Sequence, residues 1–541
     1  MYKGIMSIIS FRFAFFFTIT AIVYFVFPIK KYQWTVLLAA SYVFYAFSNV
    51  KFFLFILLTT LTSYYAARLM DKIKEQQKKT LAENKQIWDR EQKKSFKSEN
   101  EKHIRRIMII TLLFNFGILF LLKYMPTLLE KSGNLFGFSA PTLRLLLPLG
   151  ISFYTFQAMG YVIDVSRGEV RAERNIAKLA LFVSFFPQLI QGPISKYDQL
   201  AGQLYEEHRA DFTRIKYGLE LALWGLFKKL VIADRAAIAI QTVTEAPFSF
   251  TGTTLGFTVL LYALQLYADF SAGIDIARAS AQILGIDMIQ NFRQPYFATT
   301  LTDYWNRWHI SLGAWMKNYV FYPIALSKTA NKITRAIKGS RFGQSKVGSH
   351  IAVVLPGTVA SLIVFLIVGV WHGTGWRYIL YGLWNGGVIM LSILLKPCFE
   401  WVNHLLHVNP ATPEHRLFQI IRTFVLVCIG NITDLARGGR DCFVWVWRIL
   451  TDQRPFAGRT EIFEKLGLGA HDYNLLIVCT LLLYIVGVIR EQNPDTPLRE
   501  LLDKRLFITR WLLIFLCIIS ILAFGIYGPG YSAGEFAYMQ F

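Results

Sequence analysis

Residues 350–395 read HIAVVLPGTVASLIVFLIVGVWHGTGWRYILYGLWNGGVIMLSILL, and this stretch decides the fold class. The only side chains in it that carry charge or titrate near neutral pH are His350, His372 and Arg377. A helix needs about 20 predominantly apolar residues to cross the roughly 30 Å hydrocarbon core of a bilayer. The stretch is therefore long enough to cross a membrane. His372 lies within it, so its imidazole is expected inside the membrane.

Apolar stretches recur along the whole chain. Apolar residues make up 54% of the 541 positions, and further stretches lie near 13–29, 34–48, 52–70, 107–123, 143–163, 217–240, 254–285, 474–489 and 508–528. Several are shorter or longer than one span, so we expect about ten to thirteen transmembrane or re-entrant helices. The composition predicts an all-α polytopic membrane protein, surrounded by membrane lipid.

The net charge of +22, from 57 Lys and Arg against 35 Asp and Glu, has a simple cause in such a protein. Cytoplasmic loops of membrane proteins collect basic residues. Residues 71–106 carry twelve Lys and Arg against seven Asp and Glu, and residues 327–346 carry six basic residues and no acidic one. We therefore expect both segments in the cytoplasm, the N-terminus outside, and no nucleic-acid partner.

The same pattern predicts the domain organisation. Residues 1–70 form N-terminal transmembrane helices, and residues 71–106 form a basic cytoplasmic insertion. Residues 107–541 form the remaining membrane core, continuous with residues 1–70 as a single domain.

Two segments are expected to enter the membrane without crossing it. Residues 310–326 have polar sequence on both sides, and residues 181–195 contain two prolines and a glycine. Irregular backbone at membrane depth is tolerated only where protein or a wet cavity satisfies its polar groups. These segments predict a cavity or tunnel.

Two histidines are the strongest candidates for chemistry. His309 lies in YWNRWHISLGAW (304–315), and His372 lies in GVWHGTGW (369–376), each among tryptophans. A membrane histidine can serve only to hydrogen-bond a neighbouring helix. Polar groups inside membranes are nevertheless costly and favour a functional interpretation.

Other polar residues support weaker interpretations. Asp269, Asp275 and Arg278 interrupt an apolar segment, where a structural ion pair and the lining of a cavity are both possible. Gln191 precedes Gly192 and Pro193, an order typical of a rigid bend. His404 and His407 have no evident third ligand, so we expect no metal site.

Four segments together resemble the membrane-bound O-acyltransferase (MBOAT) superfamily. They are FFPQLIQGPISKY (185–197), LYADFSAGIDIARASAQILGI (266–286), NFRQPYFATTLTDYWNRWHISLGAWMKNYVFYPI (291–324) and WHGTGWRYILYGLWNG (371–386). Within the superfamily, the chain is most similar to the bacterial branch of alginate O-acetylation and teichoic-acid D-alanyl transfer proteins. The insertion at 71–106 is longer and more charged than this resemblance implies.

The resemblance implies an MBOAT-like helical bundle around a tunnel, with His309 and His372 as the catalytic pair. It also implies an acyl thioester entering from the cytoplasm and an acceptor or acyl-carrying partner arriving from outside. Acyl transfer needs a base and a donor to the oxyanion, and which histidine takes which role stays open, with His372 the favoured base. The side chains expected to line the tunnel are Gln191, Asp269, Asn306, Arg307, Trp308, Trp371 and Asn385.

We expect acetyl-CoA as the donor substrate, with no bound cofactor. Its phosphates are expected at a cytoplasmic rim of Lys332, Arg335 and Lys338, although ordinary basic loops look the same. The favoured function is O-acetylation of an exported polysaccharide. We expect the protein in the bacterial inner membrane, working with an extracytoplasmic acetyltransferase partner protein. D-alanyl transfer to teichoic acid is the alternative within the family, and a membrane transporter is the alternative class.

Overall fold

The computed structural model describes residues 6–48, 50–136, 148, 150–189, 191–454 and 465–527. Every regular element in these residues is a helix, and the prediction of an all-α polytopic membrane protein is confirmed. The chain divides into two compact units. Unit 1 holds residues 1–219 and 276–289, and unit 2 holds residues 220–275 and 290–541.

Within the described ranges, seven helices are long and apolar enough to cross a membrane. They are α3 (Phe53–Glu83), α4 (Arg90–Phe136), α11 (Gly252–Ile283), α16 (Lys346–His372), α19 (Pro413–Leu435), α22 (Ala470–Gln492) and α24 (Phe507–Phe524). The pair α17 (Trp376–Leu394) and α18 (Lys396–Leu405), bent by 60°, would make an eighth span. The remaining predicted apolar stretches form shorter helices. The expected number of ten to thirteen counted such shorter helices as re-entrant ones.

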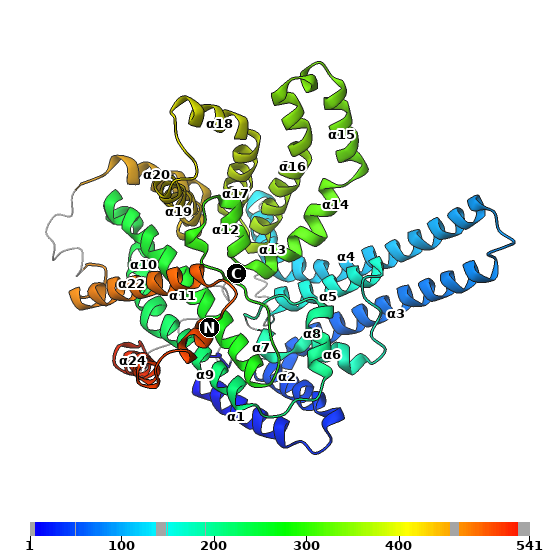
Figure 1. Ribbon diagram of the computed structural model, residues 1–541, viewed down its shortest axis with the longest axis horizontal. Coiled ribbons are helices and arrows are strands. Elements are labelled where there is room, and N and C mark those ends of the chain that lie inside the picture. Colours follow the sequence, from blue (N-terminus) through cyan, green and yellow to red (C-terminus); the bar gives the residue numbers. More distant parts are fainter. Residues whose placement is uncertain are drawn as a thin grey trace. The chain divides into compact units, whose positions relative to one another are not determined.

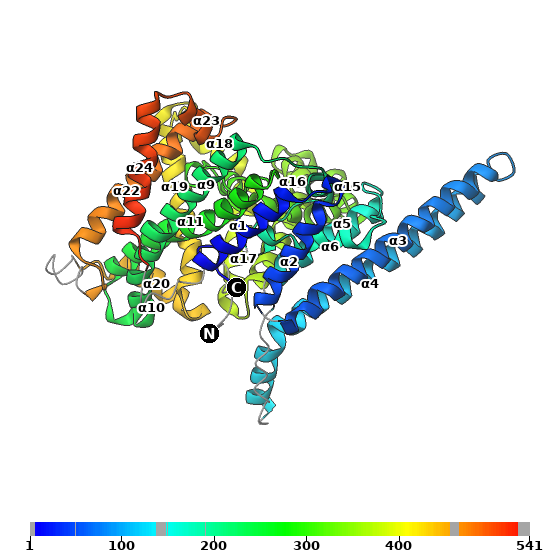
Figure 2. The same cartoon turned by 90° about the horizontal axis from the view of Figure 1, so that it is seen from below.

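Unit 1 is built around α3, α4 and α5 (Ile151–Arg167), which pack on one another. Figure 1 and Figure 2 show α3 and α4 lying side by side as a long antiparallel hairpin. The basic segment 71–106 forms the end of α3, the turn at 84–89 and the start of α4. The other helices of unit 1 are α1 (Phe11–Val26), α2 (Trp34–Ser48), α6 (Ile176–Ser184), α7 (Phe186–Leu189) and α8 (Tyr197–Tyr205), with parts of α9 (Phe212–Phe227) and α11.

Unit 2 holds the rest of α9 and α11 and the C-terminal helices. A π-helical segment, η3 (Lys228–Ala233), leads into α10 (Asp234–Glu245). The helices after α11 that do not count as candidate spans are α12 (Leu301–Arg307), α13 (Ile310–Met316), α14 (Tyr322–Ala325), α15 (Lys328–Gly339), α20 (Gly439–Thr451) and α23 (Leu498–Asp503).

The two segments expected to be re-entrant consist of short helices. Residues 310–325 form α13, the π-helical segment η6 (Lys317–Phe321) and α14. In the segment 181–195, α6 ends at Ser184 and α7 covers only Phe186–Leu189. None of these helices reaches the length of about 20 residues that a crossing needs.

The stretch quoted at the outset folds into α16 and α17, which pack against each other as a hairpin (Figure 1). Glycines allow the two backbones to meet. A Cβ atom at Gly382 would lie 2.6 Å from the carbonyl oxygen of Phe365, and one at Gly386 would lie 2.9 Å from the Cα of Leu362. Small residues permit this close approach of membrane helices.

Gly382→Ala is therefore expected to destabilise the protein, because the new methyl group meets backbone that cannot move aside. Overpacking of this kind costs about 1–3 kcal/mol. Gly387→Ala is the matched control, since a Cβ at Gly387 has nothing within 4 Å. Thermal unfolding of the two detergent-purified variants should show a lower midpoint for Gly382→Ala only. Equal midpoints would contradict the role of Gly382 in packing.

Candidate functional site

His309 lies in unit 2 at the junction of α12 and α13, where the backbone is unusual. Its φ of 47° and ψ of 51° place it in the left-handed region, which is unfavourable for a residue with a Cβ. Two backbone hydrogen bonds hold this turn: Ile310 N–H donates to Asn291 O at 3.0 Å, and Arg293 N–H donates to Arg307 O at 2.9 Å. A local strain of this kind persists only where surrounding structure enforces it.

The imidazole of His309 is almost fully buried, at 1% exposure. The ring of Phe270 meets it edge-on, with the ring centroids 4.9 Å apart. The side chain of Asn291 lies within hydrogen-bond distance of Nδ1. His309 lies outside the candidate spans, and its burial lowers its pKa well below the usual range. A positive charge on His372 would lower this pKa further. His309 is therefore neutral at physiological pH.

His372 is the last residue of α16, and it is also buried. The ring centroid of Tyr381, on α17, lies 5.3 Å from that of the imidazole. The following residue, Gly373, packs directly against the ring of Tyr378. A Cβ atom at this position would lie only 2.2 Å from the ring, so a larger residue does not fit. The loop between α16 and α17 therefore holds His372 against the aromatic side chains of α17.

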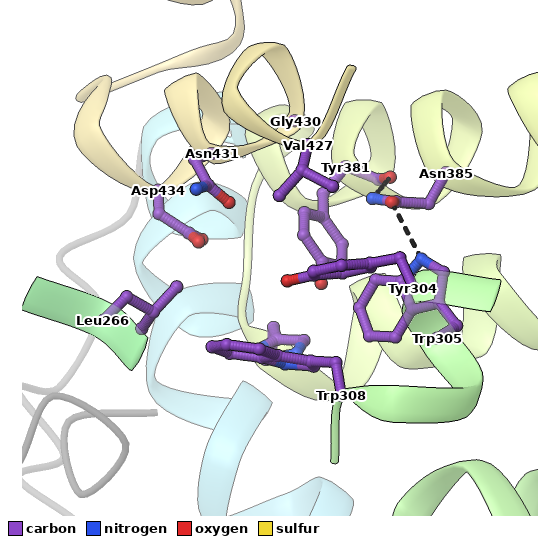
Figure 3. A pocket seen from close by; sticks show the side chains of 11 residues that line it. Leu266, Tyr304, Trp305, Trp308, Tyr381, Asn385, Val427, Gly430, Asn431 and Asp434 are labelled. Atoms are coloured by element: carbon purple, nitrogen blue, oxygen red, sulfur yellow. Dashed lines mark hydrogen bonds between the residues drawn. The ribbon is translucent and has the colours of Figure 1, made fainter. Parts of the chain in front are cut away.

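A small pocket lies beside His372 and is lined by residues from several helices of unit 2 (Figure 3). Its cavity measures about 20 Å³, which is room for about one water-sized group. The lining residues come from α11, α12, α16, α17 and α19 and the residue after α12: Leu266, Tyr304, Trp305, Trp308, His372, Tyr381, Asn385, Val427, Gly430, Asn431 and Asp434. The pocket is narrow, and much of its wall is aromatic.

Polar side chains in the pocket are held by hydrogen bonds. Trp305 Nε1 donates to Asn385 Oδ1 at 3.1 Å, the dashed line in Figure 3, and Asn385 Nδ2 donates to Tyr381 O at 3.0 Å. Tyr262 donates to a carboxylate oxygen of Asp434 at 3.4 Å. These bonds orient the amide and the carboxylate toward fixed partners.

Of the residues named from the sequence, His372, Trp308 and Asn385 line this pocket. His309 follows Trp308 directly. Trp371 lies beside His372, with ring centroids 5.0 Å apart, and Asn306 is exposed on α12.

Three other predicted tunnel residues have different surroundings. Arg307 binds Glu491 at 2.8 and 3.0 Å and Asp303 at 2.8 Å. Asp269 accepts from Lys229 at 2.7 Å. Gln191 is buried in unit 1, where its amide atoms have no hydrogen-bond partner among the described residues. Lys332, Arg335 and Lys338 are exposed on α15.

The sequence did not single out Tyr304, Trp305, Tyr381, Asn431, Asp434 or Asn291. A signal existed for Asn431 and Asp434, which interrupt the apolar helix α19 three positions apart. Polar residues inside a membrane helix are functional candidates by default. The aromatic residues carry no such signal, because aromatic side chains are common throughout this chain.

Comparison with known proteins supports the family resemblance. The sequence model of MBOAT, the membrane-bound O-acyltransferase family, matches residues 167–337. The chain carries an MBOAT domain. His309 lies inside the matched segment and His372 lies beyond it. The family resemblance is confirmed, and the first three of the four motifs lie inside the matched segment.

Three relatives are named for acyl transfer to alginate, peptidoglycan or teichoic acid. The chain is 30% identical over 410 residues to the probable alginate O-acetylase AlgI of Pseudomonas aeruginosa, covering 74% of this chain and 66% of that protein. It is 30% identical over 392 residues to the peptidoglycan O-acetyltransferase of Helicobacter pylori (68% and 64%). It is 27% identical over 301 residues to the teichoic acid D-alanyltransferase of Bacillus subtilis (54% and 69%). The chain spans about half to two thirds of the length of the O-acetylation relatives.

Proposed function

We propose that this protein is a membrane O-acyltransferase that moves an acetyl group from a thioester donor toward an exported cell-surface polysaccharide. The supporting observation is that both histidines are buried in unit 2: His372 lines the pocket, and His309 directly follows Trp308, which also lines it. The MBOAT domain and the polymers named for the relatives agree with this proposal.

The proposed chemistry is a single displacement at the acyl carbon. One imidazole removes the proton of the acceptor hydroxyl, whose oxygen forms the new C–O bond. The C–S bond breaks, and the proton passes from the imidazole to the leaving thiolate. The other imidazole stabilises the negative charge on the carbonyl oxygen. A pocket that excludes water protects the thioester from hydrolysis.

Purified protein in proteoliposomes tests the proposal. With acetyl-CoA as the donor and a polysaccharide fragment as the acceptor, free thiol and O-acetyl groups should appear in equal amounts. A variant with both histidines replaced by alanine supplies the background. If thiol release with the acceptor present is no faster than this background, the protein is not an acyltransferase under these conditions, and the transporter alternative is favoured.

D-alanyl transfer to teichoic acid is the second candidate, because one relative carries that name. The two candidates differ in the group that is transferred. Mass spectrometry of envelope polymers from cells with and without the gene should show loss of acetyl esters. Loss of alanyl esters instead would favour the second candidate.

We further propose that residues 1–70 and 107–541 act as one catalytic membrane domain, with residues 71–106 as a cytoplasmic insertion. A tunnel lined by the predicted residues of unit 2 would bring the donor to the histidines, and an extracytoplasmic acetyltransferase partner protein would present the polysaccharide hydroxyl to the acetyl group. In this orientation the N-terminus lies outside the inner membrane of the bacterium. Cysteines placed at Ser98 and Ser340, in a background without the exposed Cys398, should resist labelling from outside intact cells.

The basic face of α15 is the proposed binding site for the donor's phosphates. Lys332, Arg335 and Lys338 are exposed there, while Ala330 on the same helix is buried. Replacing all three by Gln is expected to raise the KM for acetyl-CoA with little change in kcat. Exposed ion pairs contribute roughly 0.2–1 kcal/mol each, so the loss of three amounts to about a three- to 150-fold rise in KM at low salt.

The control for this variant neutralises three exposed lysines elsewhere, Lys94, Lys97 and Lys102 of α4, by the same substitution. Their loss should leave KM unchanged. Salt should weaken the difference between the two triple variants, because it screens exposed charges. An equal KM for both at low ionic strength would leave only membrane topology as the reason for the basic residues of α15.

A further inference from the structure

Asn291 is a fully buried side chain that lies against His309, and its amide is held in one orientation. We propose that Asn291 is a positioning residue that keeps His309 as a hydrogen-bond donor at Nε2 and thereby leaves the role of base to His372. This inference rests on the proposed acyl transfer for its consequence, while its structural part can be tested without it.

The orientation of the amide follows from Ser311. The backbone N–H of Ser311 donates to Asn291 Oδ1 at 2.8 Å. A backbone N–H can only donate, so the atom that it meets must be the oxygen and not the amide nitrogen. The other amide atom is then Nδ2, and it is the one closer to His309 Nδ1, at 3.2 Å against 3.4 Å for Oδ1.

This orientation selects the tautomer of the imidazole. Nδ2 of an amide can only donate, so Nδ1 of His309 accepts in the shorter contact, while Oδ1, at 3.4 Å, already accepts from Ser311. A neutral imidazole that accepts at Nδ1 carries its hydrogen on Nε2. The backbone hydrogen bond from Ile310 N–H to Asn291 O holds the segment after His309 against Asn291. Because His309 and Asn291 are both buried, water does not compete for their hydrogen bonds.

The tautomer divides the work between the two histidines. An Nε2–H group can donate to the carbonyl oxygen of the thioester as negative charge develops there, but it cannot take up a proton. His372 then removes the proton of the acceptor hydroxyl and delivers it to the thiolate when the C–S bond breaks. Removing one such oxyanion donor typically costs about 10²- to 10³-fold in rate.

The tautomer can be measured directly. Protein labelled with ¹⁵N-histidine should show one imidazole, absent from His309→Gln, with its hydrogen on Nε2. In Asn291→Asp the carboxylate still accepts the hydrogen bond from Ser311 N–H. A carboxylate cannot donate to His309, so Nδ1 should gain a hydrogen and donate to it. A wild-type spectrum with the hydrogen of His309 on Nδ1 would overturn the proposal, whether or not Asn291→Asp folds and whether or not the protein transfers acyl groups.

Substitutions by glutamine test the division of roles. The side-chain amide of glutamine donates from a position similar to that of Nε2 but is not a base. His309→Gln should therefore transfer acyl groups at least about tenfold faster than His309→Ala, since a donor is partly replaced. His372→Gln should be as slow as His372→Ala. Faster transfer by His372→Gln than by His309→Gln would overturn the assignment. Asn291→Asp should slow transfer by about 10- to 100-fold, as changes to groups that orient a functional histidine do at metal sites.

Discussion

Acyl transfer should be lost almost completely when His372 is replaced by alanine, and it should fall strongly in His309→Ala. Loss of a general base typically costs about 10²- to 10⁴-fold, and loss of an oxyanion donor about 10²- to 10³-fold. Both imidazoles are buried in unit 2; among the described residues His372 lines the pocket, and His309 directly follows Trp308, which also lines it. The rate of O-acetyl formation by equal amounts of purified protein measures the effect.

The control for these variants is His404→Ala, which removes an exposed imidazole from α18. It should transfer at the wild-type rate. The double variant of His309 and His372 should be little slower than His372→Ala, because residues that act in one step are not additive. Near-normal transfer by either single variant, in protein that elutes as a single species, would refute the catalytic assignment.

The second large effect is expected at Lys229, which lies in the π-helical segment η3. Its ammonium group lies 2.7 Å from Asp269 Oδ1 and 2.9 Å from Asp234 Oδ1. The neighbouring Lys228 binds Asp275 at 2.8 Å and Ser271 at 2.6 Å. Lys229 and Asp269 are both 1% exposed, so water cannot replace a missing partner.

Lys229→Met should therefore destabilise the fold severely. Removing one partner of a buried ion pair costs about 3–5 kcal/mol, because an uncompensated charge stays behind. The yield of monodisperse protein and its thermal unfolding midpoint should both fall. Asp269→Asn should be milder, since Asp234 still faces the lysine, and it should partly rescue Lys229→Met when combined with it.

The matched control is Lys396→Met, which breaks the exposed pair with Glu400 at 3.7 Å. Exposed pairs contribute roughly 0–1 kcal/mol, so this variant should unfold at nearly the wild-type temperature. Equal midpoints for Lys229→Met and Lys396→Met would show that the buried cluster does not hold η3 to α11. The transfer rate per folded molecule of Asp269→Asn then tests its predicted place in the tunnel.

The amino-acid sequence by itself determined the fold class. Apolar stretches of membrane-spanning length are local features, and a helix is the one way for a single segment to satisfy its own backbone in lipid. Motif order and spacing were also sufficient to indicate the MBOAT family, whose model matches residues 167–337, and to single out His309 and His372. The break of the 350–395 stretch at Gly373 is local as well, since glycine and threonine interrupt the apolar pattern there.

Only the tertiary structure decided which side chains share a site. Asn431 and Asp434 enter the pocket because α19 packs against α17, and Asp269 meets Lys229 because η3 lies beside α11. Asn291 reaches His309 through a backbone turn held by residues 291–293 and 307–310. Hydropathy and motif spacing describe each segment separately, whereas hydrogen bonds and ion pairs of this kind depend on the positions of segments far apart in the chain. The polar environment of each histidine is therefore a property of the packed helices.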